Sequence, residues 1–394
     1  MPIQILELRS VHGTGGGPDK TILFGAAAAD PACCRVTACY LRARGDDLFE
    51  LDATARRLGI DYVEIGERHS LDPAIWPTLR RIVRERRIDI VHAHDYKTDG
   101  LALMLARVEP VRAMTTMHGW TGQSRREEWL YYPIDRRIAR AFARVVAVSS
   151  DIRDELIRTG TPESRVVTLL NGIDPKRFRR DPARVEAARR ALSVPGKAVV
   201  IGAVGRLERQ KRFDVLIDAF ADLRGRRRDA LLLIAGEGSQ RAALEAQIKL
   251  RSLGAVVRLV GHCHDVVAFH HAIDVLAQSS EYEGTPNVVL EAMAMETPIA
   301  ATDVGGTRDL LADGACGRLV PSDDPRALAA AIEAAIDDRH SERVRAARSR
   351  VETELSFERR TRTLEGIYAQ VMQDAASERA TWRTSRWVSA SGRR

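Results

Sequence analysis

The sequence predicts an α/β fold made of two domains, each a parallel sheet covered by helices. Short apolar runs of strand length alternate with helical patterns along the chain. This alternation breaks at the turn signal Asn171-Gly172 and restarts near residue 198. The 394 residues are also more than one hydrophobic core usually holds. Because ligands of such sheets bind at the carboxyl ends of strands, we expect the two halves to face each other across a cleft.

The first domain is expected over residues 1–175, followed by a polar, arginine-rich linker over 176–197. The strands predicted for this domain are 3–8, 36–41, 88–92, 113–116 and 145–148, and the helices between them include 73–86 and 98–107.

The second domain is expected over residues 198–355, and a helix over 325–338 closes it. Its predicted strands are 198–204, 230–235, 256–260, 275–278, 299–301 and 317–320. A final helix is expected over 356–374. The remaining residues, 375–394, are basic and rich in serine and arginine, which is typical of a flexible tail.

The composition narrows the class of protein. With 45% apolar residues the chain is globular, and it contains no apolar run long enough for a membrane-spanning helix. The first residues lack the pattern of a secretory signal, and five cysteines without paired spacing favour free thiols in a reducing cytoplasm. The net charge of +7 suits anionic partners such as nucleotides or lipid headgroups. Nucleic acid is not an expected partner, because the basic residues are scattered and not interleaved with aromatic ones.

The most informative motif joins two carboxylates, Glu283 and Glu291, across a predicted helix start. Thr285 is expected to cap this helix and Pro286 to occupy its first position, while Gly284 allows a sharp turn before it. Free amides at a helix start suit a diphosphate, and ionised carboxylates accept hydrogen bonds from sugar hydroxyls. The motif therefore indicates a nucleotide-sugar site, although an ordinary amphipathic helix with solvated glutamates would share its pattern.

This motif closely resembles the Glu-x7-Glu element of the retaining glycosyltransferases of family 4. The segment that begins at Thr297 and ends with Gly305 and Gly306 strengthens the resemblance. Glu296 and Asp309 depart from the glycine and the glutamate that the family usually carries near these positions. The resemblance covers nearly the whole chain and implies the GT-B fold, in which two Rossmann-like, doubly wound domains face each other and the last helix crosses back to the first.

The resemblance also implies roles for the motif. Glu291 would hold the ribose of the donor, and Glu283 would hold and orient its sugar. The other donor-binding residues expected at this helix start are Gly284, Thr285, Pro286 and Asn287.

Two cations follow the first strand of the second domain. Gly205 precedes Arg206 and Lys211, whose side chains suit phosphate oxygens. By resemblance they hold the leaving nucleotide diphosphate, and Gly236, at the end of another strand, lies near the base. A solvated basic loop is the alternative interpretation.

In the first domain, a glycine-rich loop follows the first strand. Pro18 stands where a dinucleotide fingerprint needs its third glycine, so that fingerprint fails. By resemblance, Gly15 and Gly16 face the phosphates and the acceptor, and His118, at a strand end, contacts the donor sugar. A plain loop and a structural histidine are the alternatives.

Two histidine clusters remain. His92 is expected to be structural, and His94 to be structural or to lie on the acceptor side. The cluster over 262–265 is interpreted as structural, because its alternating ligands converge poorly on one ion. The sequence contains no Asp-x-Asp motif, so we expect neither a metal nor a cofactor, with side chains neutralising the diphosphate instead.

Together these features predict a hexosyltransferase-type enzyme. It would move a sugar from a UDP- or GDP-type donor to a hydroxyl of a glycan or lipid-linked acceptor, with retention of configuration, in exopolysaccharide or cell-surface glycan synthesis. A sugar-nucleotide epimerase of the same fold and a non-catalytic sugar-nucleotide-binding protein are the alternatives. A cytoplasmic location is expected. The tail and an arginine-bearing helix over 131–144 could contact anionic lipid at the inner face of the membrane, although packing of this helix on the sheet is favoured.

Overall fold

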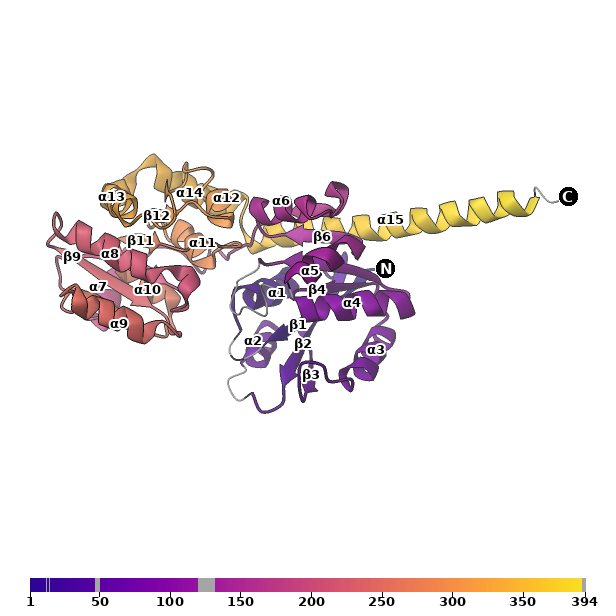
Figure 1. Ribbon diagram of the computed structural model, residues 1–394. Coiled ribbons are helices and arrows are strands. Elements are labelled where there is room, and N and C mark those ends of the chain that lie inside the picture. The colour runs from indigo at the N-terminus through magenta and orange to yellow at the C-terminus, as the bar shows by residue number, and fades with distance from the viewer. Residues whose placement is uncertain (12, 14, 47–49, 120–131, 392–394) are drawn as a thin grey trace.

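The computed structural model describes residues 1–11, 13, 15–46, 50–119 and 132–391, with the side chains of 379–391 left out. It consists of two α/β domains, seen side by side in Figure 1. Each domain is built on one sheet whose strand pairs are all parallel. This is the doubly wound GT-B architecture that the sequence predicted.

The first sheet has seven strands among the described residues, in the order β3-β2-β1-β4-β5-β6-β7. Its elements are β1 (Ile3–Val11), α1 (Gly17–Ala28), β2 (Cys34–Ala43), α2 (Leu51–Leu58), β3 (Asp61–Glu67), α3 (Ile75–Glu85), β4 (Ile90–Ala93), α4 (Tyr96–Val108), β5 (Arg112–Met117), α5 (Tyr132–Ile138), β6 (Arg144–Ala147), α6 (Ser150–Arg158) and β7 (Val166–Thr168). Strands β3 and β7 were missed from the sequence, because β3 is partly exposed and interrupted by acidic residues and β7 is three residues long.

The second sheet has six strands among the described residues, in the order β10-β9-β8-β11-β12-β13. Its elements are α7 (Pro182–Ala191), β8 (Val199–Val204), α8 (Phe213–Arg224), β9 (Ala230–Ala235), α9 (Arg241–Leu250), β10 (Val257–Gly261), α10 (Val266–Ala272), β11 (Val275–Gln278), α11 (Asn287–Ala294), β12 (Ile299–Thr302), α12 (Gly306–Leu310), β13 (Arg318–Val320), α13 (Pro325–Ile336) and α14 (Glu342–Thr353). Central strands such as β9 are buried along their whole length, as expected of a parallel sheet covered on both faces.

The expected linker over 176–197 is partly helical. Asp181 caps α7 by accepting a hydrogen bond from the Ala183 amide, and Pro182 occupies its first turn. Arg189 of this helix donates to the Ala272 carbonyl of the second domain. The helix therefore belongs to the second domain, and its charged sequence reflects one solvent-facing side.

The last helix, α15 (Phe357–Ser391), lies along the first domain and projects beyond it (Figure 1). Leu364, Ile367, Tyr368 and Val371 pack against Ile5 and other buried residues of the first sheet. The helix was expected to end near residue 374 and a flexible tail to follow, but the structure continues it to Ser391.

The helix expected over 131–144 is shorter in the structure. Helix α5 ends at Ile138, a short 3-10 turn follows, and strand β6 begins at Arg144, while residue 131 lies outside the described residues.

The chain passes between the domains at two points that lie together. The Ile173 amide donates to the Leu355 carbonyl at 2.9 Å, and the Phe357 amide donates to the Ile173 carbonyl at 3.0 Å. Ile173 and Ser356 thus form a parallel bridge between the outgoing and the returning segment. Within the described residues, no helix combines the length and the hydropathy that crossing a bilayer requires.

Candidate active site

Two loops of the second domain meet beside the start of α11. Lys211 follows β8 and Glu283 follows β11, and Lys211 Nζ lies 2.5 Å from Glu283 Oε1. The same oxygen accepts the Ser280 hydroxyl at 2.6 Å and faces Gln278 Nε2 at 3.5 Å. Both side chains of the ion pair are largely buried, with 16% and 8% of their surface exposed. None of these described bonds uses Glu283 Oε2, so this oxygen can accept a hydrogen bond from a ligand.

Glycines allow the loops around Lys211 to pack closely. A Cβ at Gly205 would lie 3.2 Å from Lys211 Cε, so glycine leaves room for the lysine side chain. Gly236 has a φ of +150°, and a Cβ there would lie 1.8 Å from the Gly205 carbonyl oxygen. The predicted pair Gly205 and Gly236 is thus explained by backbone contact between two strand ends. Arg206 is exposed on the same loop.

The paired glycines after β12 support the loop that carries Glu283. A Cβ at Gly305 would lie 2.1 Å from the Glu283 carbonyl oxygen, and one at Gly306 would lie 1.8 Å from that of Gly284. Only glycine permits this approach. The two glycines therefore allow the loop that carries Glu283 to lie directly against the loop that follows β12.

The start of α11 differs from the prediction. The helix begins at Asn287, with Pro286 in the cap position and no side-chain cap. The Thr285 hydroxyl instead donates to the Val148 carbonyl of the first domain and lies 3.4 Å from the Asn171 amide. Thr285 as helix cap was therefore wrong, because its hydroxyl is used in a contact between the domains.

Glu291 lies on α11, just over one turn from the start of the helix, and is buried. Its Oε2 lies 3.3 Å from His270 Nε2 of α10, and its Oε1 lies 3.5 Å from Lys20 Nζ of α1. Burial alone would raise the pKa of Glu291, but the His270 hydrogen bond and the Lys20 charge outweigh it and lower this pKa. The carboxyl group is therefore ionised at neutral pH and accepts hydrogen bonds.

The glycine-rich loop of the first domain approaches α11. A Cβ at Gly17 would lie 3.0 Å from Asn287 Nδ2. Gly15 has a φ of +75°, and the Gly16 amide donates to Asp19 Oδ2 at 2.6 Å. Asp19 is buried and also pairs with Arg9 of β1, so the loop is held by a fixed carboxylate.

His118 follows β5 and reaches the same place from the first domain. A Cβ at Gly284 would lie 2.5 Å from the His118 carbonyl oxygen, so the two loops touch. Burial is the largest of the effects that lower the pKa of His118 well below its ordinary value, so the ring is neutral. Its Nε2 lies 3.1 Å from His94 Nδ1.

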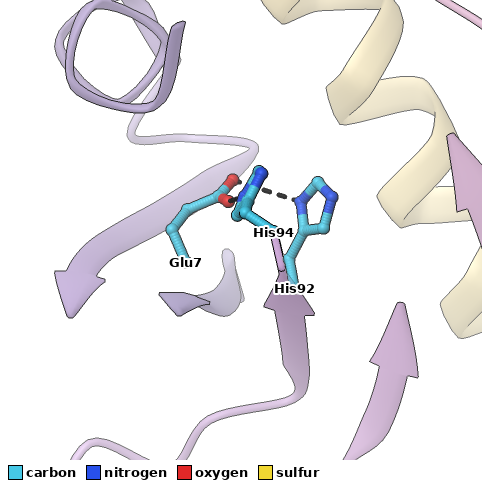
Figure 2. Close-up of side chains that lie close together, drawn as sticks. All are labelled: Glu7, His92 and His94. Atoms are coloured by element: carbon cyan, nitrogen blue, oxygen red, sulfur yellow. Dashed lines mark hydrogen bonds and ion pairs between the residues drawn. The ribbon is translucent and has the colours of Figure 1, made fainter. Parts of the chain in front are cut away.

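Behind His118 lies a buried cluster of Glu7, His92 and His94, shown in Figure 2. Glu7 Oε2 contacts His94 Nε2, and Tyr368 of α15 donates to Glu7 Oε1 at 2.7 Å. Tyr368 also lies 2.8 Å from His92 Nδ1. Within the described residues this trio is the one set of three such side chains close enough to hold a metal ion.

The cluster over 262–265 has a structural use. Asp265 caps α10 by accepting a hydrogen bond from the Ala268 amide at 2.9 Å. The rings of His262 and His264 pack edge to face at the surface.

The structure thus brings most of the predicted site residues together. Lys211 pairs with Glu283, the neighbouring Gly284 lies against His118, and Gly16 lies in the loop that faces Asn287. The residues that were missed are Glu7, Asp19, Lys20, His270 and Tyr368. Of these, Lys20 had a local signal, since it follows the glycine-rich loop by one helical turn.

Comparison with known proteins agrees with this geometry. Residues 17–177 match the model of Glycosyltransferase Family 4, and residues 184–351 match that of the glycosyl transferases group 1. A D-inositol 3-phosphate glycosyltransferase of Kineococcus radiotolerans is 32% identical over 326 residues, which cover 75% of this chain and 74% of that protein. The chain belongs to glycosyltransferase family 4.

This chain is also similar to other proteins. A glycogen synthase of Mycobacterium tuberculosis is 30% identical over 287 residues, covering 70% of this chain and 67% of that protein. Among solved structures, Anabaena Alr3699/HepE in complex with UDP superimposes with a TM-score of 0.80 at 19% identity, covering 93% of this chain and all of that one. This family 4 chain therefore has the GT-B fold and is a transferase.

Proposed function

We propose that this chain is a retaining hexosyltransferase. It moves a sugar from a nucleoside-diphosphate sugar, with UDP the first choice, to a hydroxyl of a glycan or lipid-linked acceptor in cell-surface or exopolysaccharide synthesis. The observation that carries the proposal is the Lys211–Glu283 pair, which sets one cation and one carboxylate beside the start of α11. The solved relative Anabaena HepE was crystallised with UDP and with UDP-glucose, which supports the choice of donor.

The proposed donor lies across the two domains. Its diphosphate meets Lys211, with Arg206 on the same loop, and the free amides at the start of α11. Its ribose binds Glu291, whose ionised carboxylate accepts two hydroxyl hydrogen bonds. Its sugar meets Glu283 Oε2 and the neutral ring of His118.

These residues give the transfer its chemistry. The bond between the anomeric carbon and the diphosphate oxygen breaks, and the acceptor oxygen bonds to the same face of that carbon. The acceptor proton passes to the departing diphosphate. Lys211 stabilises the negative charge that grows on this leaving group, which is electrostatic catalysis by a group already in place. In this mechanism side chains supply the positive charge and no metal or cofactor is required.

A thermal-shift screen tests the proposal. UDP, GDP, ADP and their sugar conjugates are each added with and without EDTA, since a ligand that binds the folded state raises its melting temperature. We expect a shift with one nucleotide family that EDTA leaves unchanged. Incubation of that donor with acceptors, followed by NMR of the anomeric proton, then gives the configuration of the product.

The same experiment separates the alternatives. An epimerase would convert the donor sugar without any acceptor, and a binding protein would show the shift without turnover. A product with inverted configuration would overturn the retaining mechanism.

We also propose a cytoplasmic enzyme whose basic C-terminal end contacts anionic membrane. The proposal rests on the arginine-rich sequence after Ala375 and on the projection of α15 beyond the first domain. Flotation with phosphatidylglycerol vesicles should retain the full chain and lose a chain truncated after Ala375. Equal flotation of both would refute a role for this segment.

A further inference from the structure

A buried chain of hydrogen bonds ends at His118. It begins at Thr116, whose hydroxyl lies 2.7 Å from His92 Nε2, and passes through Tyr368 to Glu7. From Glu7 it continues through His94 to His118. Glu7 is the point where the two branches converge, since Tyr368 donates to one of its oxygens and His94 contacts the other. Figure 2 shows His94 beside the Glu7 carboxylate.

The protonation of the chain follows from its members. Burial alone would raise the pKa of Glu7, but the charge and hydrogen-bond effects of His92 and His94 together outweigh it and lower this pKa well below its ordinary value, so Glu7 is an ionised acceptor. Burial raises the pKa of Tyr368, which keeps its hydroxyl as a donor. His94 must therefore present its Nε2–H to Glu7.

The protonation of the remaining ring nitrogens of His94 and His118 then follows. Burial lowers the pKa of His94 to about 4, so this ring is neutral and its Nδ1 is an acceptor. His118 Nε2 lies 3.1 Å from that acceptor and must carry the proton. Since His118 is also neutral, its Nδ1 carries a lone pair.

We propose that Glu7 is a positioning residue which, acting through His94, fixes His118 in the tautomer whose Nδ1 accepts a hydrogen bond from the substrate. The tautomer rests on the hydrogen-bond chain alone, whereas the identity of the substrate rests on the proposed function. A bare ring nitrogen attracts a hydroxyl proton and repels phosphate or carboxylate oxygens. His118 therefore suits a hydroxyl of the transferred sugar and not the diphosphate.

A metal ion held by Glu7, His92 and His94 is the competing explanation of this cluster. Their ligand atoms lie within 4.8 Å of one another. However, the contact between Glu7 Oε2 and His94 Nε2 is a direct hydrogen bond, and an ion would have to separate these atoms. Tyr368 and Thr116 also bond His92 at both ring nitrogens. The hydrogen-bonded arrangement uses every ligand atom without an ion.

The decisive experiment is NMR of the full chain labelled with 15N in its imidazole rings. Long-range proton–nitrogen correlations report which nitrogen of each neutral ring carries the proton, and His94→Gln and His118→Gln variants assign the signals. We expect both His94 and His118 to be protonated at Nε2. Protonation of either ring at Nδ1 would overturn the proposal, and so would loss of these signals on adding stoichiometric Zn²⁺ with binding detected by calorimetry.

Three variants separate the effect of hydrogen-bond direction at Glu7 from the effects of side-chain charge and volume. Glu7→Gln keeps an acceptor for His94, because its amide can donate to Tyr368 while the Thr116 hydroxyl rotates to complete the reversed branch. Glu7→Met removes the acceptor, so His94 should move its proton to Nδ1 and convert His118 as well. Tyr368→Phe is the matched control, since it removes the other branch and should leave both tautomers unchanged. Equal spectra for Glu7→Gln and Glu7→Met would refute the proposed role.

Activity gives a second readout. Once a donor is known, kcat/KM for Glu7→Met should fall about tenfold below that of Glu7→Gln, the factor expected for one misdirected hydrogen bond. The thermal shift with UDP should be equal in both variants, because Lys211 and Glu291 bind the nucleotide in the other domain. Absence of a thermal shift with every nucleotide of the screen in the wild-type chain would refute the proposed function and leave the tautomers to be judged by NMR.

Discussion

Substitution of Gly306 by alanine should displace the Glu283 loop. The new Cβ would lie 1.8 Å from the Gly284 carbonyl oxygen. Real Cβ contacts are essentially never shorter than 3.0 Å, so the loop must retreat by roughly 1.2 Å. Overpacking of this kind costs about 1–3 kcal/mol of unfolding free energy.

The catalytic effect should exceed the loss of stability. Glu283 lies 2.5 Å from Lys211, and a retreat of roughly 1 Å breaks this contact and moves the carboxylate away from the donor sugar. A misplacement of this size lowers kcat by about 100-fold in well-ordered sites. Denaturant unfolding measures the first effect, and donor hydrolysis or transfer measures the second.

Gly366→Ala is the matched control. Gly366 lies inside α15, and a Cβ there meets nothing within 4 Å. This substitution should raise stability by about 0.4–1 kcal/mol and leave the rate unchanged. If Gly306→Ala turned over like the wild-type chain, the loop would not be held where the structure places it, and the reasoning from close glycine contacts would fail.

Three further predictions concern charge. Lys211→Met should lower kcat by about 100- to 1,000-fold, the usual effect of removing one group that stabilises a leaving oxyanion. Substitution of the exposed Lys249 of α9 by Met should leave kcat unchanged, and equal rates for the two variants would refute the role assigned to Lys211. Glu291→Gln should weaken UDP binding about 10- to 100-fold by calorimetry, because a carboxylate accepts stronger hydrogen bonds than an amide, and unchanged affinity would place the ribose elsewhere. His94 has a folded-state pKa of about 4, below its ordinary value of 6.5, so the unfolded chain binds the extra proton between these values. The contribution of His94 to stability should therefore fall as pH drops through 6.5, by about 3 kcal/mol at pH 4. In denaturant titrations a His94→Gln variant should show a shallower slope, to which His118 still contributes, while a variant with the exposed His264 replaced by Gln keeps the full slope.

The fold could be predicted from the sequence because the patterns that mark its strands and helices are local in the chain. Apolar runs bounded by turn residues mark the buried central strands, and these matched the structure closely. Strands β3 and β7 were not predicted, because β3 is half exposed and β7 is short. The helix within 176–197 was not predicted, because its charged, solvent-facing side has the composition of a linker.

The residues of the candidate site likewise include some that the sequence could predict and some that it could not. Glu283 and Lys211 could be found because each follows a strand within a few residues of a glycine that shapes its loop. Glu7 could not, since it sits inside a strand and its partner Tyr368 is 361 positions away. A sequence shows that Tyr368 belongs to an apolar stripe, but only the packed helix shows where its hydroxyl points.

The two crossings of the chain explain how such a site can be assembled. Ile173 and Phe357 are joined by backbone hydrogen bonds, so any change in the angle between the domains must act at this bridge. Helix α15 starts there and packs on the first sheet, which keeps Tyr368 beside Glu7 whatever the second domain does. The contacts that would break on opening are those between domains, such as Thr285 with Val148 and Lys20 with Glu291.

It follows that His118 is oriented within the first domain and that the Lys211–Glu283 pair is set within the second. Each half is ordered by bonds of its own before a donor arrives. A closure of the domains would then bring two ordered surfaces together and would not have to build either one. Such a division keeps the entropic cost of assembling the site small, because few side chains remain to be fixed when the substrate binds.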